Sequence, residues 1–168
     1  MDSIAAFLRP LYQDLDGVSR MDEVERIARI ARELYDVSGD DAFELLLAFH
    51  RLGHWLDKVG NLTRTALVVG IDEAALYRTA DAIRHLDAPR DDAECAVAAA
   101  VIIDAAGVRG LAERLTRARR EGLTVEDVAR AGLREMEVPE WFSAKARVML
   151  LERAEARRDV CRKILGES

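Results

Sequence analysis

Apolar residues recur at helical spacing along most of the chain. One face of the segment after residue 20 is apolar at intervals of three and four residues, at Val24, Ile27, Ala28, Ala31 and Leu34. Residues 72–85 repeat this pattern, and residues 96–105 are apolar nearly all round, which is typical of a central buried helix. No segment alternates with a period of two, so the pattern predicts an all-α fold.

Capping patterns and chain breaks set the expected helix boundaries. Residues 19–22 and 91–94 match the capping box, in which a side chain at the helix start and an acid three residues later each accept a backbone N–H. Thr124 is expected to begin another helix, and Pro139 suits the first turn of a long terminal helix. The expected helices include residues 3–15, 42–58, 62–69, 72–85, 96–105 and 124–136, together with a basic helix that ends near residue 122.

A chain of 168 residues predicts one domain with a substantial core. Half of the residues are apolar but only 5% are aromatic, so the core must consist mainly of Ala, Leu, Val and Ile. We therefore expect a single helical domain of about seven to nine helices over residues 1–168.

Charge and apolar content narrow the expected partners. The formal net charge of −6 gives no overall attraction to nucleic acid or to an anionic membrane, and the apolar run 96–103 is too short to cross a bilayer. Cys95 and Cys161 have no metal-site or redox spacing, which indicates two reduced thiols. The N-terminus lacks a signal-peptide pattern, so we expect a cytoplasmic protein without a membrane partner.

The positive charges are concentrated late in the chain. Residues 109–120 carry five arginines, and residues 145–163 are also basic. Such a patch would suit a phosphate or a partner, and a helical adaptor or nucleic-acid module built on it would bind in a salt-sensitive way. A solvated helix face with interleaved acids explains the pattern better, and the overall acidity makes nucleic-acid binding unlikely.

The most informative segment is residues 48–53, which read Ala-Phe-His-Arg-Leu-Gly at the end of an apolar run. This segment resembles the Leu-Leu-His-Asp-Ile-Gly motif of the HD superfamily, the all-helical metal-dependent phosphohydrolases. Residues 23–27 are similar to its first motif, His-x-x-Arg-Val. Residues 82–85 resemble the motif Ala-Ile-x-x-His, except that the histidine comes one residue early. Residues 104–108 resemble the motif Asp-Ala-Asp-x-Leu. The resemblance covers about residues 20–165 and implies an HD-like helical bundle.

The departures from these motifs fall on the metal ligands. The resemblance places Glu23 at the first histidine, Arg51 at the aspartate of the His-Asp pair and Ala106 at the later aspartate, while His50 is retained. No histidine precedes His50, and no His-Asp dipeptide occurs in the chain. Because Arg51 is a permanent cation where a metal would lie, we expect neither a metal nor another cofactor, and no catalytic residue. We expect Arg51 to pair with Glu23 or with Asp104 instead.

The leading interpretation is thus a degenerate, catalytically inactive HD-fold protein that acts as a ligand-binding, regulatory or scaffold module. Its residual pocket would be lined by Glu23, His50, Arg51, His85 and Asp104, and Arg51 would suit a small anionic ligand. A second copy of the chain is another partner that this interpretation allows. The alternative is a phosphohydrolase acting on a nucleotide or phosphomonoester, in which His50, Glu23, His85 and Asp104 hold a divalent metal such as Mn, Fe or Mg.

Overall fold

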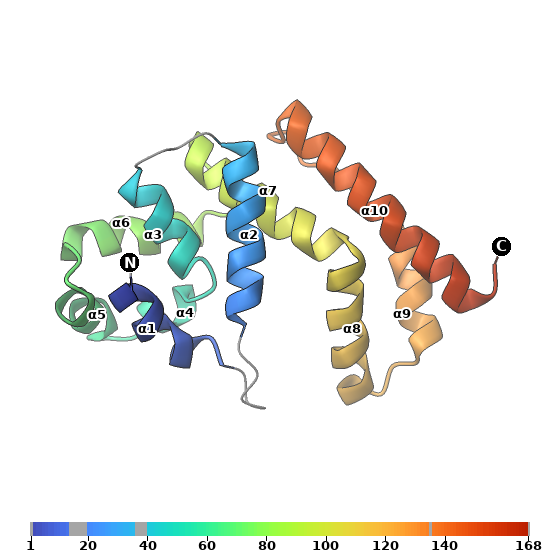
Figure 1. Cartoon of the computed structure of the whole chain (residues 1–168), viewed down its shortest axis with the longest axis horizontal. Helices are drawn as coiled ribbons and strands as arrows, with labels where there is room; N and C mark the ends of the chain where they lie inside the picture. The colour runs from blue at the N-terminus through green and yellow to red at the C-terminus, as the bar shows by residue number, and fades with distance from the viewer. Residues whose placement is uncertain (1, 14–19, 36–39, 135, 168) are drawn as a thin grey trace. The chain divides into compact units, whose positions relative to one another are not determined.

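The computed structural model describes residues 2–13, 20–35, 40–134 and 136–167, which form helices throughout (Figure 1). No β-strand occurs in these ranges, which confirms the all-α prediction. They contain ten helices, slightly more than expected. The chain divides into two compact units, Met1–Ala98 and Ala99–Ser168.

The first unit is built around α6. It contains α1 (Asp2–Leu11), α2 (Met21–Leu34), α3 (Asp41–Phe49), α4 (Gly53–Leu56), α5 (Asn61–Val69) and α6 (Glu73–Arg84). Helix α6 contacts α3, α4 and α5, while α1 packs on α5 and α2 packs on α3. Burial of Phe49, Leu56 and Leu76 at the centre of these contacts removes large apolar side chains from water, which drives the packing.

Helix α7 (Asp92–Ala106) begins in the first unit and continues into the second. Its start follows the predicted capping pattern, because the Asp91 side chain accepts the Glu94 backbone N–H at 2.8 Å. The Glu94 carboxylate reaches back one residue further than expected and accepts the Arg90 backbone N–H at 2.8 Å.

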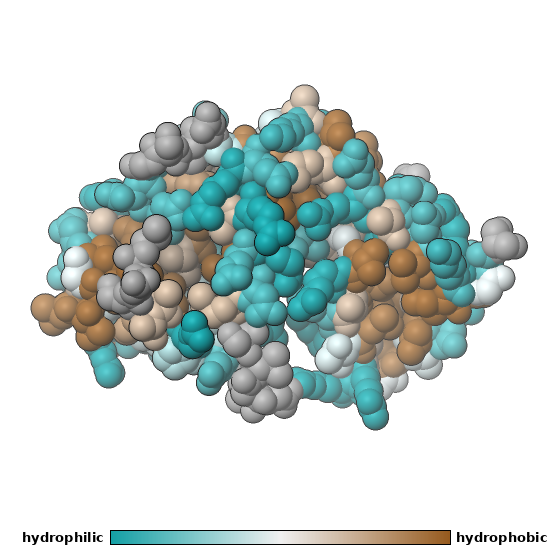
Figure 2. Space-filling model, viewed as in Figure 1, coloured by the Kyte–Doolittle hydropathy of each residue, from teal (hydrophilic) through white to brown (hydrophobic). Residues whose placement is uncertain are grey.

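The second unit contains three further helices, α8 (Val108–Glu121), α9 (Val125–Gly132) and α10 (Ala144–Leu165). Helices α8 and α9 lie side by side, and α10 packs against both (Figure 1). Leu111, Val128 and Ala129 form the core between them. Hydrophobic residues gather on the surface over α8 and α9 (Figure 2).

Two glycines in the second unit allow close packing. A Cβ atom on Gly132 would lie 2.5 Å from the buried sulfur of Cys161. A Cβ atom on Gly110 would lie 2.1 Å from the carbonyl oxygen of Ala105. Both distances are below van der Waals contact, so these positions require a residue without a side chain.

Residues 38–41, 70–73 and 124–127 each carry a sequence pattern that predicts a helix start, and the caps are confirmed where the structure describes them. Asp40 accepts the backbone N–H groups of Ala42 and Phe43, and Asp72 accepts that of Ala75. Thr124 forms a reciprocal capping box with Asp127. The predicted box at residues 19–22 begins at Ser19. The sequence Ser-Gly-Asp-Asp at residues 38–41 predicts a chain break that begins at Ser38. Both serines lie outside the described residues.

Three predicted helix ends were wrong. The first helix ends at Leu11 instead of residue 15. The Tyr12 carbonyl oxygen accepts the backbone N–H of Arg20 at 2.8 Å, which is not a hydrogen bond of a continuous helix. Helix α9 ends at Gly132 rather than 136, where the glycine packs on the C-terminal helix. The terminal helix begins at Ala144, capped by Ser143, rather than at Pro139.

The late start of α10 has a visible cause in its first turn. The Arg147 guanidinium donates to the carbonyl oxygens of Pro139, Glu140 and Phe142, which holds this segment as a turn in front of the helix.

Within the described ranges, no single helix is both long and apolar enough to span a membrane. Helices α7 and α8, which are bent by 66° at their junction, meet these two criteria only when taken together.

Candidate functional site

The HD-like segment forms a break between two helices. The predicted helix 42–58 was wrong in this respect, because α3 ends at Phe49 and α4 begins at Gly53. The Nδ1 atom of His50 hydrogen-bonds to the carbonyl oxygen of Leu47 at 2.7 Å, the acceptor that the Arg51 N–H would use in a continuous helix. The break thus divides the predicted helix into α3 and α4, which adds one helix to the expected number.

Arg51 forms an ion pair with Glu23, one of the two partners expected from the sequence. Its Nη2 atom lies 2.9 Å from Oε1 of Glu23. The Glu23 side chain is only 8% exposed, whereas that of Arg51 is 37% exposed. Glu23 is in the first turn of α2, where the positive end of the helix dipole also favours a carboxylate. The buried carboxylate is therefore compensated from two directions.

His50 is buried beside this pair and is held neutral. Since a carbonyl oxygen only accepts, the Leu47 contact assigns the ring proton to Nδ1. The Nε2 atom is buried and has no hydrogen-bond partner among the described residues. The pKa of His50 is lowered from 6.5 to about 4, mainly by burial; the Leu47 carbonyl opposes this shift, and the Arg51 charge adds to it.

Tyr12 joins the segment to the N-terminal helix, and its role was missed from the sequence. Its hydroxyl donates to the Ala48 carbonyl oxygen at 2.7 Å. Burial raises the pKa of this hydroxyl well above its usual range, so it remains protonated and can donate. The two contacting segments are 36 residues apart, and no local pattern around Tyr12 indicates the contact.

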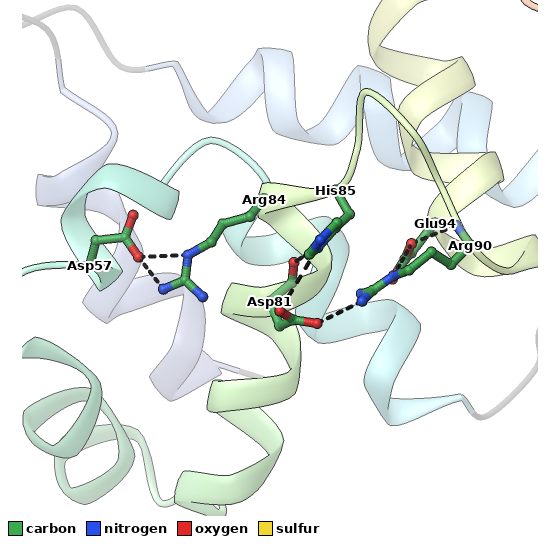
Figure 3. A network of polar contacts seen from close by, with 6 residues as sticks. All are labelled: Asp57, Asp81, Arg84, His85, Arg90 and Glu94. Carbon is green, nitrogen blue, oxygen red and sulfur yellow. Dashed lines mark hydrogen bonds and ion pairs between the residues drawn. The ribbon is translucent and has the colours of Figure 1, made fainter.

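His85 lies in a different polar network (Figure 3). It is the C-terminal capping residue of α6, and its Nδ1 atom donates to the Asp81 carbonyl oxygen at 2.8 Å. Arg90 contacts Asp81 at 2.8 Å and Glu94 at 2.7 Å, and its hydrogen bonds lower the pKa of both carboxyl groups. A histidine is a favourable residue at the C-terminal end of a helix, and these contacts agree with that role for His85.

The structure brings together Glu23, His50 and Arg51 of the five predicted pocket residues. The polar contacts of His85 are with Asp81. Asp104, the other expected partner of Arg51, is a buried residue in the second unit.

The residues present do not fit a metal centre of the HD type. His50 offers one unpartnered nitrogen, but Glu23 is neutralised by Arg51, whose charge would repel a cation. Catalytic metal sites usually need three protein ligands. Among the residues that the structure describes, no group of three or more His, Cys, Asp or Glu side chains is arranged to hold a metal ion.

A broad groove of about 1130 Å³ lies elsewhere in the first unit, between α3, α6 and the start of α7. Its lining includes Phe43, Leu45 and Leu46 of α3, and the exposed Tyr77 of α6. Six carboxylates and two arginines also line it: Asp40, Asp41, Asp72, Asp81, Asp91, Glu94, Arg78 and Arg90. The lining of the groove therefore combines an excess of acidic side chains with apolar ones.

Local sequence signals identified several of these acids only as helix caps. Asp40, Asp72 and Asp91 each accept a backbone N–H at a helix start. Their convergence on one groove follows from the packing of three helices, which capping patterns do not predict.

Comparisons of the chain with protein-family models, with curated proteins and with solved structures find no match. The resemblance to the HD superfamily stays a prediction that rests on the sequence motifs alone.

Proposed function

We propose that this protein is a degenerate member of the HD superfamily that performs no metal-dependent hydrolysis and acts as a ligand-binding, regulatory or scaffold module. The observation that carries this proposal is the Arg51–Glu23 ion pair, with its 2.9 Å contact at the two positions where the family motifs place metal ligands. A cation supplied by the chain itself takes the electrostatic role of the metal in this interpretation.

The chemistry of the pair supports this interpretation. A guanidinium remains charged throughout the physiological pH range, so Arg51 does not become a metal ligand by losing a proton. A metal bound to Glu23 would have to displace Arg51 and would leave two cations close together. His50 alone provides too few ligands to offset that repulsion.

We expect the purified protein to hold far less than one equivalent of manganese or iron and to release no phosphate from nucleotides or phosphomonoesters. Replacing the pair by the family residues, Glu23→His with Arg51→Asp, should increase manganese affinity by about tenfold or more, because it removes a cation and places an unpaired histidine and a carboxylate beside His50. Elemental analysis of protein purified without chelator and titration with manganese measure the two effects.

The matched control is Glu23→Gln with Arg51→Gln, which removes the ion pair without adding a histidine and an aspartate. It should leave manganese affinity close to that of the wild type. Stoichiometric manganese or iron in the wild type, together with phosphate release, would establish the alternative phosphohydrolase and exclude our proposal.

The acidic groove supports a second proposal, on where such a module would bind a partner. We propose that it takes a basic amphipathic helix, with apolar side chains against the α3 and α6 surfaces and lysines or arginines toward the carboxylates. Arg90 is already engaged by Asp81 and Glu94, so the remaining four aspartates face a single further arginine, Arg78, among the lining residues. This charge excess favours a basic occupant.

A labelled peptide of about 18 residues, with leucine and lysine at helical spacing, provides a probe of about five turns. We expect the change Asp41→Asn with Asp72→Asn to weaken its binding by about tenfold, since each exposed ion pair contributes up to about 0.7 kcal/mol. Asparagine retains the capping oxygen of Asp72, so the fold should be preserved. Fluorescence anisotropy at low and moderate salt measures the effect.

The change Asp87→Asn with Glu126→Gln provides the control, because it removes the same charge from exposed positions outside the groove lining. It should weaken peptide binding by less than about twofold. Equal weakening by both double variants would show only non-specific attraction to an acidic protein. A change in oligomeric state on loss of the groove charges would instead identify a second copy of the chain as the occupant.

A further inference from the structure

The second unit contains a buried arginine that has no counter-ion among the residues that the structure describes. Arg157 of α10 is only 4% exposed. Its Nη1 atom lies 3.3 Å from the sulfur of Met136, and its Nη2 atom lies 3.4 Å from the Arg134 carbonyl oxygen. Its Nε atom is buried without a partner, and no carboxylate of the described residues pairs with it. The two contacts are long and neutral, so the positive charge is poorly compensated.

Other arginines increase this local excess of positive charge. Arg158, the next residue, pairs with Glu155 at 2.8 Å but also has a buried Nε atom without a partner. Burial, and then the charges of Arg114 and Arg158, lower the pKa of Arg157. An arginine does not readily become neutral to escape such a site, so the charge must be balanced from elsewhere.

Arg157 also lines a cavity. The cavity has a volume of about 200 Å³, and Arg134 and Arg158 line it with Arg157. Its other walls are apolar and consist of Met136, Val138, Leu150, Leu151 and Ala154. This volume equals that of about seven water molecules in the liquid, enough for an anionic head group and a short carbon chain.

We propose that this cavity binds a small organic anion whose carboxylate or phosphate group lies against Arg157 and whose aliphatic part contacts the leucine and valine side chains. A guanidinium matches the planar or tetrahedral oxygens of both anions, and the apolar walls exclude a strongly hydrated inorganic ion. The site is separate from the Arg51 segment, where the sequence had placed the anionic ligand, and it does not depend on the proposed loss of hydrolysis.

Butanoate and butyl phosphate are suitable probes, with butyramide as the neutral analogue and inorganic phosphate as the head group alone. At constant ionic strength, we expect at least one of the two butyl anions to bind the full-length protein and raise its unfolding temperature. Butyramide should have no effect, because it lacks the charge that compensates Arg157. Preference for butanoate or for butyl phosphate identifies the head group, and titration calorimetry measures both affinities.

Arg157→Met tests the buried charge without opening a large cavity. We expect this variant to lose butyl-anion binding and to unfold at a higher temperature than the ligand-free wild type, because methionine removes an uncompensated buried charge. Arg157→Lys should weaken binding by about tenfold or more, since an ammonium lacks the planar fork. Arg153→Met, on the same helix and outside the cavity lining, should leave binding unchanged.

Glu135 provides a further test, because it lies in the sequence between two cavity-lining residues and outside the described ranges. If an external anion compensates Arg157, Glu135→Gln should bind butyl anions at least as tightly as the wild type. Anion binding that appears only in Glu135→Gln would identify an internal counter-ion and overturn the proposal. Equal binding of butyramide and the butyl anions, or unchanged binding by Arg157→Met, would also overturn it.

Discussion

Replacing Gly110 by alanine is expected to destabilise the second unit by about 3 kcal/mol or more, at the upper end of the usual cost of overpacking. The new Cβ atom would lie 2.1 Å from the oxygen, 2.6 Å from the carbonyl carbon and 2.8 Å from the Cα atom of Ala105. All three are backbone atoms, so no side-chain rotation relieves the clash. Helix α8 would have to move away from the end of α7.

Gly107 provides the matched control three residues earlier. A Cβ atom there would lie 3.5 Å from the nearest atom, the Cδ of Arg153, which is ordinary van der Waals contact. Gly107→Ala should therefore cost no more than about 1 kcal/mol, mainly because alanine is a poorer N-cap than glycine. Thermal and urea unfolding, followed by circular dichroism, compare the variants. Equal stability of Gly110→Ala and Gly107→Ala would contradict the close approach of α8 to Ala105.

Acidification from pH 6.5 to 4 is expected to destabilise the wild type relative to His50→Asn by up to about 3 kcal/mol. The folded-state pKa of His50 is lowered from 6.5 to about 4, so between these values the unfolded state binds more protons than the folded state. The stability from keeping His50 neutral is fully present above pH 6.5 and is lost as the pH falls through this window.

The physical cause lies in the two ring nitrogens of His50. Its Nδ1–H already donates to Leu47, and protonation would add a second donor at Nε2, which is buried without a partner, close to the Arg51 charge. Asparagine does not titrate and can retain a donor toward the Leu47 carbonyl. Urea unfolding at a series of pH values gives the stability difference between the two proteins.

His54→Asn is the control, since this histidine is exposed and lies four residues further along. Its stability should follow that of the wild type across the pH range. Parallel stability curves for the wild type and His50→Asn would contradict a buried, neutral His50. Carboxylates titrate in all three proteins, so their contribution cancels in the comparison.

Much of the secondary structure was predictable because its signals are local. The acceptors Asp72 and Thr124 lie within three residues of the N–H groups that they cap. The end of α3 was not predictable in this way, because the hydroxyl of Tyr12, far earlier in the chain, binds the Ala48 carbonyl oxygen there, and the His50 ring binds that of Leu47. Helix propensity favours continuation through that segment, and a tertiary contact overrides it.

Among the polar residues too, the sequence predicts some contacts and leaves others unpredicted. The Glu23–Arg51 pair was predictable because the motif comparison placed both residues at one site. The position of Arg157 was not, because on a basic helix an arginine that faces a cavity has the same sequence pattern as one that faces water. Residues 145–163 looked like a solvated face, yet Arg157 is buried among apolar neighbours.

The close contact between Gly132 and Cys161 has a consequence for following the protein in solution. Cys161 is buried in the second unit and Cys95 is partly buried in the first; both thiols are unpaired, and burial raises the pKa of each. Alkylation of Cys161 therefore requires α9 and α10 to separate, which links its labelling rate to that opening equilibrium. Mass spectrometry of the Cys161 peptide can therefore follow the opening of the second unit in the unmodified chain, with the partly buried Cys95 as the more accessible reference.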